Sequence, residues 1–316
     1  MRWVVVWSRA HHRRAAAFPG DCDIFPGCEV YFWPSLRNFT TNPLGRYQRP
    51  PQVEIMSART KLFAILWVAG WLGVLSFLLV DLFALLAALP VTAGKPMPFP
   101  PLVVKLLSII QSTVFLSVAI FIGRELAPKV GLSSPVAEAA AEGRKLLSVL
   151  KPQIIPGLIG GLAGGIAILA SWVLAKPFLP LTFVARAEEF NKILPLFTRL
   201  LYGGITEELL VRWGLLTLLV WGAWRLFQGG RGRPPAIYFM GAIFLSSVLF
   251  GVGHLPLAFA LTGHLTASII CYVVIANSVF GLIAGYLYWK KGLESAILAH
   301  MLAHVVIVTA GGFATR

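Results

Sequence analysis

The sequence predicts an all-α, multi-pass membrane protein with about seven transmembrane helices. Hydrophobic residues make up 57% of the 316 residues and charged residues only 13%, whereas soluble domains carry about 25% charged residues. Mean hydropathy is +0.78. Apolar runs close to the ~20 residues that cross a bilayer recur along the chain. Lys and Arg gather in alternate loops between these runs, as expected of membrane helices.

The net charge of +14 does not indicate a nucleic-acid partner. The basic residues stand singly or in pairs between apolar runs, rather than in one block or on one face. Anionic lipid head groups are the expected counter-charge. We therefore expect membrane lipid as a partner and no nucleic acid.

The first 55 residues differ from the rest of the chain. They are rich in Arg, Pro and aromatic residues and show no sustained periodicity. Met56 stands just before the first long apolar run. Residues 1–55 are therefore predicted to be a disordered tail or the product of a mis-assigned start.

Seven spans are expected after this tail, each with a core near the length that crosses the hydrocarbon layer. The expected ranges are Leu62–Leu89, Leu102–Gly123, Ile154–Leu174, Leu194–Phe227, Ala236–Leu255, Ala267–Trp289 and Leu293–Gly312.

The loop charges predict the orientation. The segments before span one and after spans two, four and six are basic, and the other loops carry few or balanced charges. The positive-inside rule then places the N-terminus in the cytoplasm and the C-terminus outside.

Two segments bear on packing. Gly157, Gly161 and Gly165 recur at four-residue spacing in span three, which favours close helix packing within the molecule over the alternative of a dimer face. Ser133–Leu150 alternates polar and apolar residues at helical spacing and is expected to lie in the membrane interface as an amphipathic helix.

Span four contains charges that need an explanation. Glu207, Glu208 and Arg212 fall within six residues of an apolar run, and each charge at the bilayer centre costs at least ~2.5–3.5 kcal/mol. Glu208 and Arg212 are four residues apart, so they share a helix face and can form an ion pair. A purely structural pair or a transporter's proton relay are alternatives, but the first leaves the second carboxylate unexplained.

Three histidines follow in apolar runs. His254 closes Phe250-Gly251-Val252-Gly253-His254 at the end of span five, with Pro256 placed to break the helix beyond it. His300 and His304 are one turn apart in span seven. That spacing can bind a metal, although the glutamate of the zincin H-E-x-x-H motif is missing.

Together, Glu207-Glu208-x-x-x-Arg212, Phe250-x-x-x-His254 and His300-x-x-x-His304 resemble the three motifs of the CPBP family. That family includes type II CAAX prenyl endopeptidases and bacteriocin-processing, abortive-infection and immunity-type proteins. The resemblance covers about Leu194–Gly312. It departs at His304, where the family often has asparagine.

The resemblance implies intramembrane peptide hydrolysis by a metalloprotease-like peptidase. Glu207 and His254 would activate water, with Glu208 and His300 completing the catalytic set and Arg212, Phe250 and His304 supporting it. His300 and His304 would stabilise the oxyanion. Alternatively, Glu207, His254, His300 and His304 would hold a divalent metal such as zinc.

The expected organisation is N-terminal transmembrane helices with an amphipathic connector over 56–190 and a CPBP-like catalytic core over 191–316. The substrate would be a peptide or protein, with or without a lipid group. A non-proteolytic immunity or partner-binding protein is the main alternative, and a proton-coupled transporter the second.

One geometric difficulty arises from the expected spans. His254 comes late in span five, whereas His300 comes early in span seven, and both spans run in the same direction. At 1.5 Å per residue, straight helices would place the two residues at different depths.

Overall fold

The computed structural model describes residues 52–80 and 99–314, and these residues form helices and no strands. Within these two ranges, seven helical segments are long and apolar enough to cross a membrane. They span Ala58–Leu79, Leu102–Val130, Leu146–Phe178, Leu196–Gln228, Ala236–Thr262, Ala267–Lys291 and Leu293–Ala310. The predicted all-α, multi-pass class is therefore confirmed.

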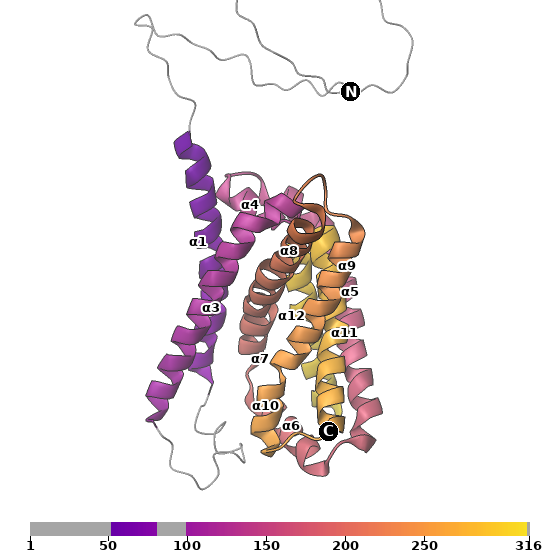
Figure 1. Cartoon of the computed structure of the whole chain (residues 1–316). Coiled ribbons are helices and arrows are strands. Elements are labelled where there is room, and N and C mark those ends of the chain that lie inside the picture. The colour runs from indigo at the N-terminus through magenta and orange to yellow at the C-terminus, as the bar shows by residue number, and fades with distance from the viewer. Residues whose placement is uncertain (1–51, 81–98, 315–316) are drawn as a thin grey trace, which may run out of the picture. The chain divides into compact units, whose positions relative to one another are not determined.

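From α3 onward the helices follow one another with short connections (Figure 1). Those that carry the spans are α1 (Gln52–Ser76) with η1 (Phe77–Leu79), α3 (Pro101–Val130), α5 (Leu146–Ala175) with η2 (Lys176–Phe178), the fourth span described below, α9 (Ala236–Gly253) with α10 (Leu255–Thr262), α11 (Ala267–Lys291) and α12 (Leu293–Ala314). Two shorter helices, α4 (Pro135–Ala141) and α6 (Leu181–Ile193), lie between spans.

Several predicted span ends are wrong. In span one the described helical residues reach Leu79, and the predicted end at Leu89 lies outside the described residues and stays a prediction. Span two continues past Gly123 to Val130, where Gly131 with a φ of 77° stops the helix. Span three begins at Leu146 rather than Ile154. Hydropathy marked the apolar centre of these helices but missed their polar ends.

The predicted amphipathic helix over Ser133–Leu150 is also wrong. Only Pro135–Ala141 forms a separate helix, α4, and Gly143 turns the chain with a φ of 70° before α5 starts. Ala137, Ala139 and Ala141 are buried, and α4 packs against α1 and α5. The small side chains of this segment bury against neighbouring helices instead of facing lipid.

The expected tail, residues 1–55, lies mostly outside the described residues, and its predicted disorder or mis-assigned start stays a prediction. α1 itself begins at Gln52, four residues before Met56. The predicted division at residue 191 and the orientation of the termini also stay predictions.

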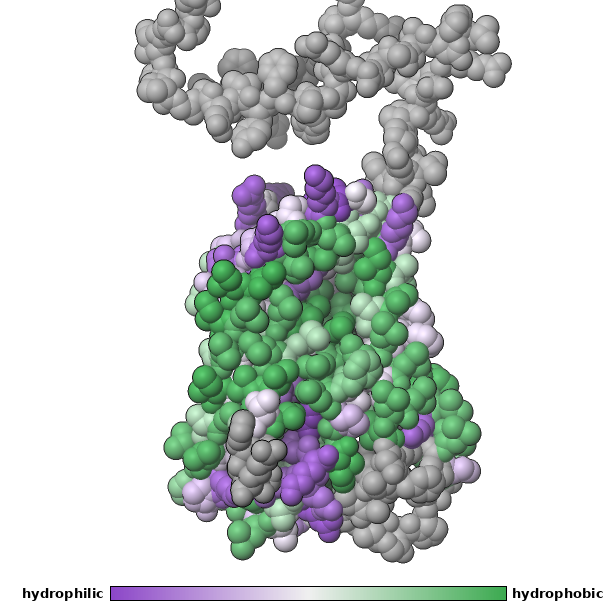
Figure 2. All heavy atoms as spheres, turned by 180° about the vertical axis from the view of Figure 1, so that it is seen from behind, coloured by the Kyte–Doolittle hydropathy of each residue, from purple (hydrophilic) through white to green (hydrophobic). Residues whose placement is uncertain are grey.

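The molecule's surface matches a membrane environment. On the face shown in Figure 2, hydrophobic residues cover the middle and hydrophilic residues gather toward the two ends. Leu102, Ile155 and Phe244 are among the large apolar side chains that the fold leaves exposed. In water such an apolar surface would be costly, whereas lipid tails cover it without cost.

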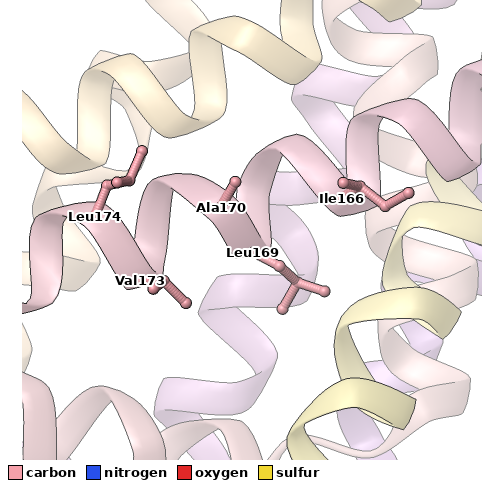
Figure 3. A pocket seen from close by; sticks show the side chains of 5 residues that line it. All are labelled: Ile166, Leu169, Ala170, Val173 and Leu174. Atoms are coloured by element: carbon pink, nitrogen blue, oxygen red, sulfur yellow. The ribbon is translucent and has the colours of Figure 1, made fainter.

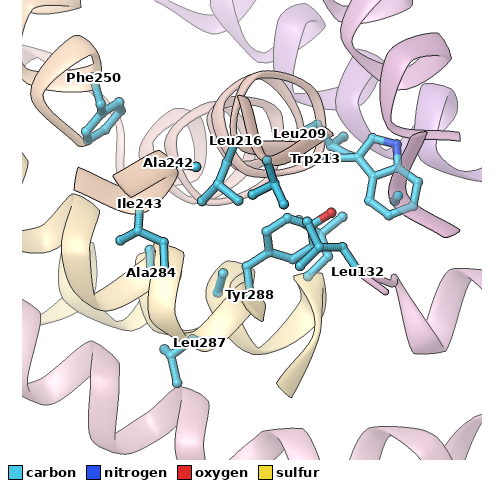
Figure 4. Close-up of a cluster of buried hydrophobic side chains, with 14 of the residues drawn as sticks. Leu132, Leu209, Trp213, Leu216, Ala242, Ile243, Phe250, Ala284, Leu287 and Tyr288 are labelled. Carbon is cyan, nitrogen blue, oxygen red and sulfur yellow. The ribbon is translucent and has the colours of Figure 1, made fainter. Parts of the chain in front are cut away.

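The buried core joins span four to its neighbours (Figure 4). Leu209, Trp213 and Leu216 of span four pack against Ala284 and Tyr288 of α11, and none of these side chains is more than 1% exposed. The indole of Trp213 donates to the carbonyl oxygen of Ile120 over 3.3 Å, which ties span four to α3. These contacts hold the segment that carries Glu207 and Glu208 in one position.

The glycines of α5 pack inside the molecule, as predicted. A Cβ atom added to Gly161 would lie 2.7 Å from Leu302 Cβ and 2.8 Å from the carbonyl oxygen of Ala299, both on α12. Gly157 and Gly165 face α12 in the same way, and Gly160 and Gly164 face α11. The small residues therefore let α5 approach two helices closely.

Gly161→Ala is expected to lower thermal stability, because the backbone carbonyl it would meet cannot move aside. Overpacking of this kind costs about 1–3 kcal/mol. Gly241→Ala is the matched control, since a Cβ there meets no atom within 4 Å. Thermal unfolding of both variants in detergent checks this; equal melting temperatures would show that α5 and α12 can separate.

Candidate active site

The fourth span carries the two glutamates on an unusual stretch of helix. It consists of α7 (Leu196–Thr198), the π-helical segments η3 (Arg199–Glu207) and η4 (Leu209–Leu216), and α8 (Thr217–Gln228). In the second segment the amide of Thr217 donates to the carbonyl of Arg212, five residues earlier. π-Helical turns are rare and frequently mark functional sites. Their wider turn here coincides with the Glu207–Glu208 pair.

Glu208 and Arg212 form a fully buried ion pair, as predicted. Arg212 Nη1 lies 2.9 Å from Glu208 Oε1, and the two side chains are 1% and 0% exposed. Arg212 Nη2 also donates to the carbonyl oxygen of Gly281 over 3.2 Å. The guanidinium lies over the rings of Phe250 and Phe280, at 4.9 and 5.9 Å from their centroids. Such aromatic faces stabilise a cation that has left water.

His300 links the two glutamates. Its Nδ1 lies 2.7 Å from Glu208 Oε1, and its Nε2 lies 3.9 Å from Glu207 Oε2. A carboxylate can only accept a hydrogen bond, so Nδ1 donates to Glu208 and Nε2 is left as an acceptor. Two acceptors 3.9 Å apart are close enough for one water molecule to donate to both.

Glu207 differs from Glu208 in its surroundings. Its side chain is 22% exposed, whereas that of Glu208 is fully buried. Glu208 Oε1 contacts both Arg212 and His300, while Glu208 Oε2 is buried and has no hydrogen-bond partner among the described residues. Glu207 is the carboxylate that can meet water or a substrate.

His254 closes α9 and joins the cluster through Phe250. Its Nδ1 lies 2.8 Å from the carbonyl oxygen of Phe250, so the imidazole turns back by one helical turn toward the middle of the span. The Phe250 ring stands 4.7 Å from the ring of His254 and 6.1 Å from that of His300. The Phe250 ring therefore lies between His254 of α9 and His300 of α12 and contacts both.

His304 stacks on His300, with ring centroids 4.8 Å apart and planes inclined by 17°. Its Nδ1 and Nε2 are both buried and have no hydrogen-bond partner among the described residues. The ring lies against Gly203, where any side chain would collide with Nε2. Buried polar atoms without partners are uncommon, and one explanation is a site for a substrate or a water molecule.

The donor set does not fit a metal held by three protein side chains. In the described residues, no three His, Cys, Asp or Glu side chains are placed to hold one ion, whereas catalytic zinc sites use three protein ligands. His300 Nδ1 is already bonded to Glu208, and the charge of Arg212 lies beside that carboxylate. The metal alternative stays a prediction that metal analysis can check.

Two residues of the site gave no signal in the sequence. Phe280 lies with its ring centroid 4.4 Å from that of His300, and Gly281 supplies the carbonyl that binds Arg212. Both belong to an apolar stretch of α11 that looked like ordinary span. Gly203, before the glutamate pair, could have been noticed as a small residue that admits another helix.

One hollow of the surface is unrelated to this site. Ile166, Leu169, Ala170, Val173 and Leu174 line a cavity of ≈ 410 Å³ along α5 (Figure 3). No polar side chain lines it. It is a depression of the lipid-facing surface, and it offers no group for chemistry.

The fold and the site together define an integral membrane protein with a buried cluster of acids, histidines and one arginine inside its spans. Residues 189–306 match the family model described as Type II CAAX prenyl endopeptidase Rce1-like. This segment contains Glu207, Arg212, His254, His300 and His304, and the resemblance inferred from the three motifs is confirmed over it. At family level the match supports a CAAX-type intramembrane protease. No curated protein and no solved structure matches the chain.

Proposed function

We propose that this protein is an intramembrane endopeptidase of the CAAX type that hydrolyses a peptide bond with water activated by Glu207. The observation that carries the proposal is the arrangement of three side chains within the matched segment. Glu207 Oε2 faces His300 Nε2 at 3.9 Å, while Nδ1 of the same imidazole is bonded to Glu208. Glu207 is thereby the available base, and Glu208 orients the histidine.

In the proposed reaction, a water molecule between Glu207 and His300 attacks the peptide carbonyl carbon. Glu207 takes a proton from the water, and the carbonyl oxygen becomes an oxyanion. The C–N bond then breaks as the proton passes to the leaving amine. General acid–base catalysis of this kind contributes about 10²–10⁴-fold to the rate.

His254 and His304 are proposed to support this reaction in different ways. His254 has Nε2 available, because its Nδ1 contacts the Phe250 carbonyl, and the resemblance to the matched family implies that His254 activates water together with Glu207. His304 has two unpartnered ring nitrogens beside His300. A protonated ring nitrogen there can donate to the oxyanion, and one such donor is worth about 2.7–4 kcal/mol.

The activity can be tested with the purified full-length protein in detergent. It is incubated with a panel of peptides that share one sequence and differ in having a prenyl group, an acyl group or no lipid. Mass spectrometry identifies the cleaved bond. Cleavage supports the proposal and defines the need for a lipid. Intact peptides throughout, with a correctly folded protein, would favour the non-proteolytic alternative.

His304→Asn is expected to keep most of the activity, because an amide nitrogen can still donate a hydrogen bond. His304→Ala, which cannot donate, is expected to lose about 10²–10³-fold in kcat. The measurements are peptide cleavage by both variants and the metal content of the wild type. Stoichiometric zinc together with an inactive His304→Asn would instead support the metal alternative, since an amide replaces imidazole poorly at such ions.

A further inference from the structure

A second cavity lies where α1, α3 and α4 meet, and none of the candidate active-site residues lines it. Its volume is ≈ 420 Å³. Arg59 stands at the start of the first apolar span, and Gly131 directly follows the second. The cavity therefore lies at the boundary between the apolar spans and their polar ends, which is the level of lipid head groups.

The lining of this cavity has two chemical parts. Leu62, Pro128 and Leu132 supply apolar surface, and the polar part contains two guanidinium groups and two carboxyl groups, those of Arg59, Arg124, Glu138 and Glu142. A soluble anion would need only the second part. A molecule with a charged head and an apolar body would use both.

Arg124 is held in place and still has donors to offer. Its guanidinium lies over the rings of Phe63 and Phe121, at 5.6 and 5.2 Å from their centroids. Nε and Nη2 are each 2.9 Å from Glu125 Oε1, which leaves Nη1 without a partner among the described residues. Fixing the side chain beforehand lowers the entropy lost when a ligand binds.

Arg59 is exposed and makes no hydrogen bond or ion pair with any described residue. The two acids of the lining are less available than this arginine. Glu142 pairs with Arg144, and Glu138 Oε1 accepts from the amide of Ser134 over 3.0 Å. Burial raises the pKa of the Glu138 carboxyl above its usual value, which favours the uncharged form. The cavity therefore presents a positive charge that lacks a counter-ion.

We propose that this cavity binds the phosphate group of a membrane phospholipid through Arg59 and Arg124, with the lipid body against Leu62, Pro128 and Leu132. Guanidinium groups match phosphate oxygens in charge and in hydrogen-bond geometry. Basic pockets between transmembrane helices bind lipid head groups in this way. The bound lipid would join α1, α3 and α4 at one end of the bundle.

The test uses the full-length protein, purified in detergent and depleted of lipid. Phosphatidylglycerol, diacylglycerol with the same chains and inorganic phosphate are titrated separately. Native mass spectrometry counts bound lipid, and thermal unfolding reports stabilisation. We expect one tightly bound phosphatidylglycerol and a higher melting temperature, with a weaker effect of the two partial ligands.

Arg59→Gln is the main variant, because this exposed side chain has no described partner whose loss would disturb folding. It is expected to weaken phosphatidylglycerol binding about tenfold or more, as expected for one lost charge-assisted contact. Arg124→Gln should act in the same direction. Arg231→Gln, in the exposed loop between α8 and α9, removes the same charge away from the cavity and should bind as the wild type does.

The proposal would be overturned if Arg59→Gln bound phosphatidylglycerol as tightly as Arg231→Gln does. Lipid binding would then depend on the net charge of the protein and not on the position of the arginine. Diacylglycerol that binds as tightly as phosphatidylglycerol would overturn the role of the phosphate. If inorganic phosphate raised the melting temperature as much as phosphatidylglycerol does, the cavity would be an anion site that does not recognise lipid, and the proposal would be wrong.

Discussion

Glu207→Gln is expected to abolish peptide cleavage, with kcat lowered at least about 100-fold, while the protein stays folded and membrane-inserted. The amide keeps the size of the carboxylate but cannot take a proton from water, so the general base is lost. Folding should survive because Glu207 is 22% exposed and forms no ion pair with Arg212. Cleavage kinetics and thermal unfolding, measured on the same preparation, check both parts.

Glu189→Gln is the matched control for this variant. Glu189 is an exposed acid on α6 whose closest cation is Arg186, at 3.5 Å. The substitution removes the same carboxylate outside the buried cluster and should leave kcat unchanged. Full activity of Glu207→Gln would exclude Glu207 as the base and with it the proposed mechanism.

Glu208→Ala is expected to have its main effect on folding rather than on chemistry. It would leave Arg212 buried without its carboxylate, and breaking one side of a buried ion pair costs about 3–5 kcal/mol. His300 would lose the acceptor of its Nδ1 proton at the same time. We expect a large fall in thermal stability and in the yield of inserted protein.

The double substitution Glu208→Ala with Arg212→Met separates the two contributions. With both charges removed, the desolvation cost disappears, so stability should partly recover. Cleavage should stay low, because His300 has no carboxylate to orient it. A Glu208→Ala protein that melts like the wild type would show that the pair does not hold the spans together.

The candidate site residues can be identified from the sequence, because each polar group stands out against its apolar surroundings. Glu207, Glu208 and Arg212 are conspicuous in an apolar run, since a charge in lipid requires a partner or a function. The spacing of four residues was enough to predict that Glu208 pairs with Arg212. Together with these charges, His254, His300 and His304 form the three motifs that indicated the family, and the family model matches the segment that contains them.

Other features could not be predicted, because they depend on contacts between distant segments. The apolar positions of α11 do not reveal that Phe280 packs on His300 or that Gly281 binds Arg212. The π-helical turns of span four have no pattern in the sequence that distinguishes them from an ordinary helix. The straight-helix picture also does not reveal that one ring, that of Phe250, contacts both His254 and His300.

By itself the sequence determined the class of protein, the seven spans and the residues able to carry chemistry. A charge in lipid costs so much free energy that composition and residue spacing are sufficient to predict the spans and the unusual polar residues within them. Only the tertiary structure shows how each glutamate lies relative to His300 of another helix. Glu208 is bonded to Arg212 of its own span and to His300 of α12, whereas Glu207 Oε2 lies 3.9 Å from Nε2 of the same imidazole. The pair of Glu208 with Arg212 follows from spacing along one helix, whereas the contact of Glu208 with His300 depends on how two helices pack, and spacing along the chain does not determine that packing.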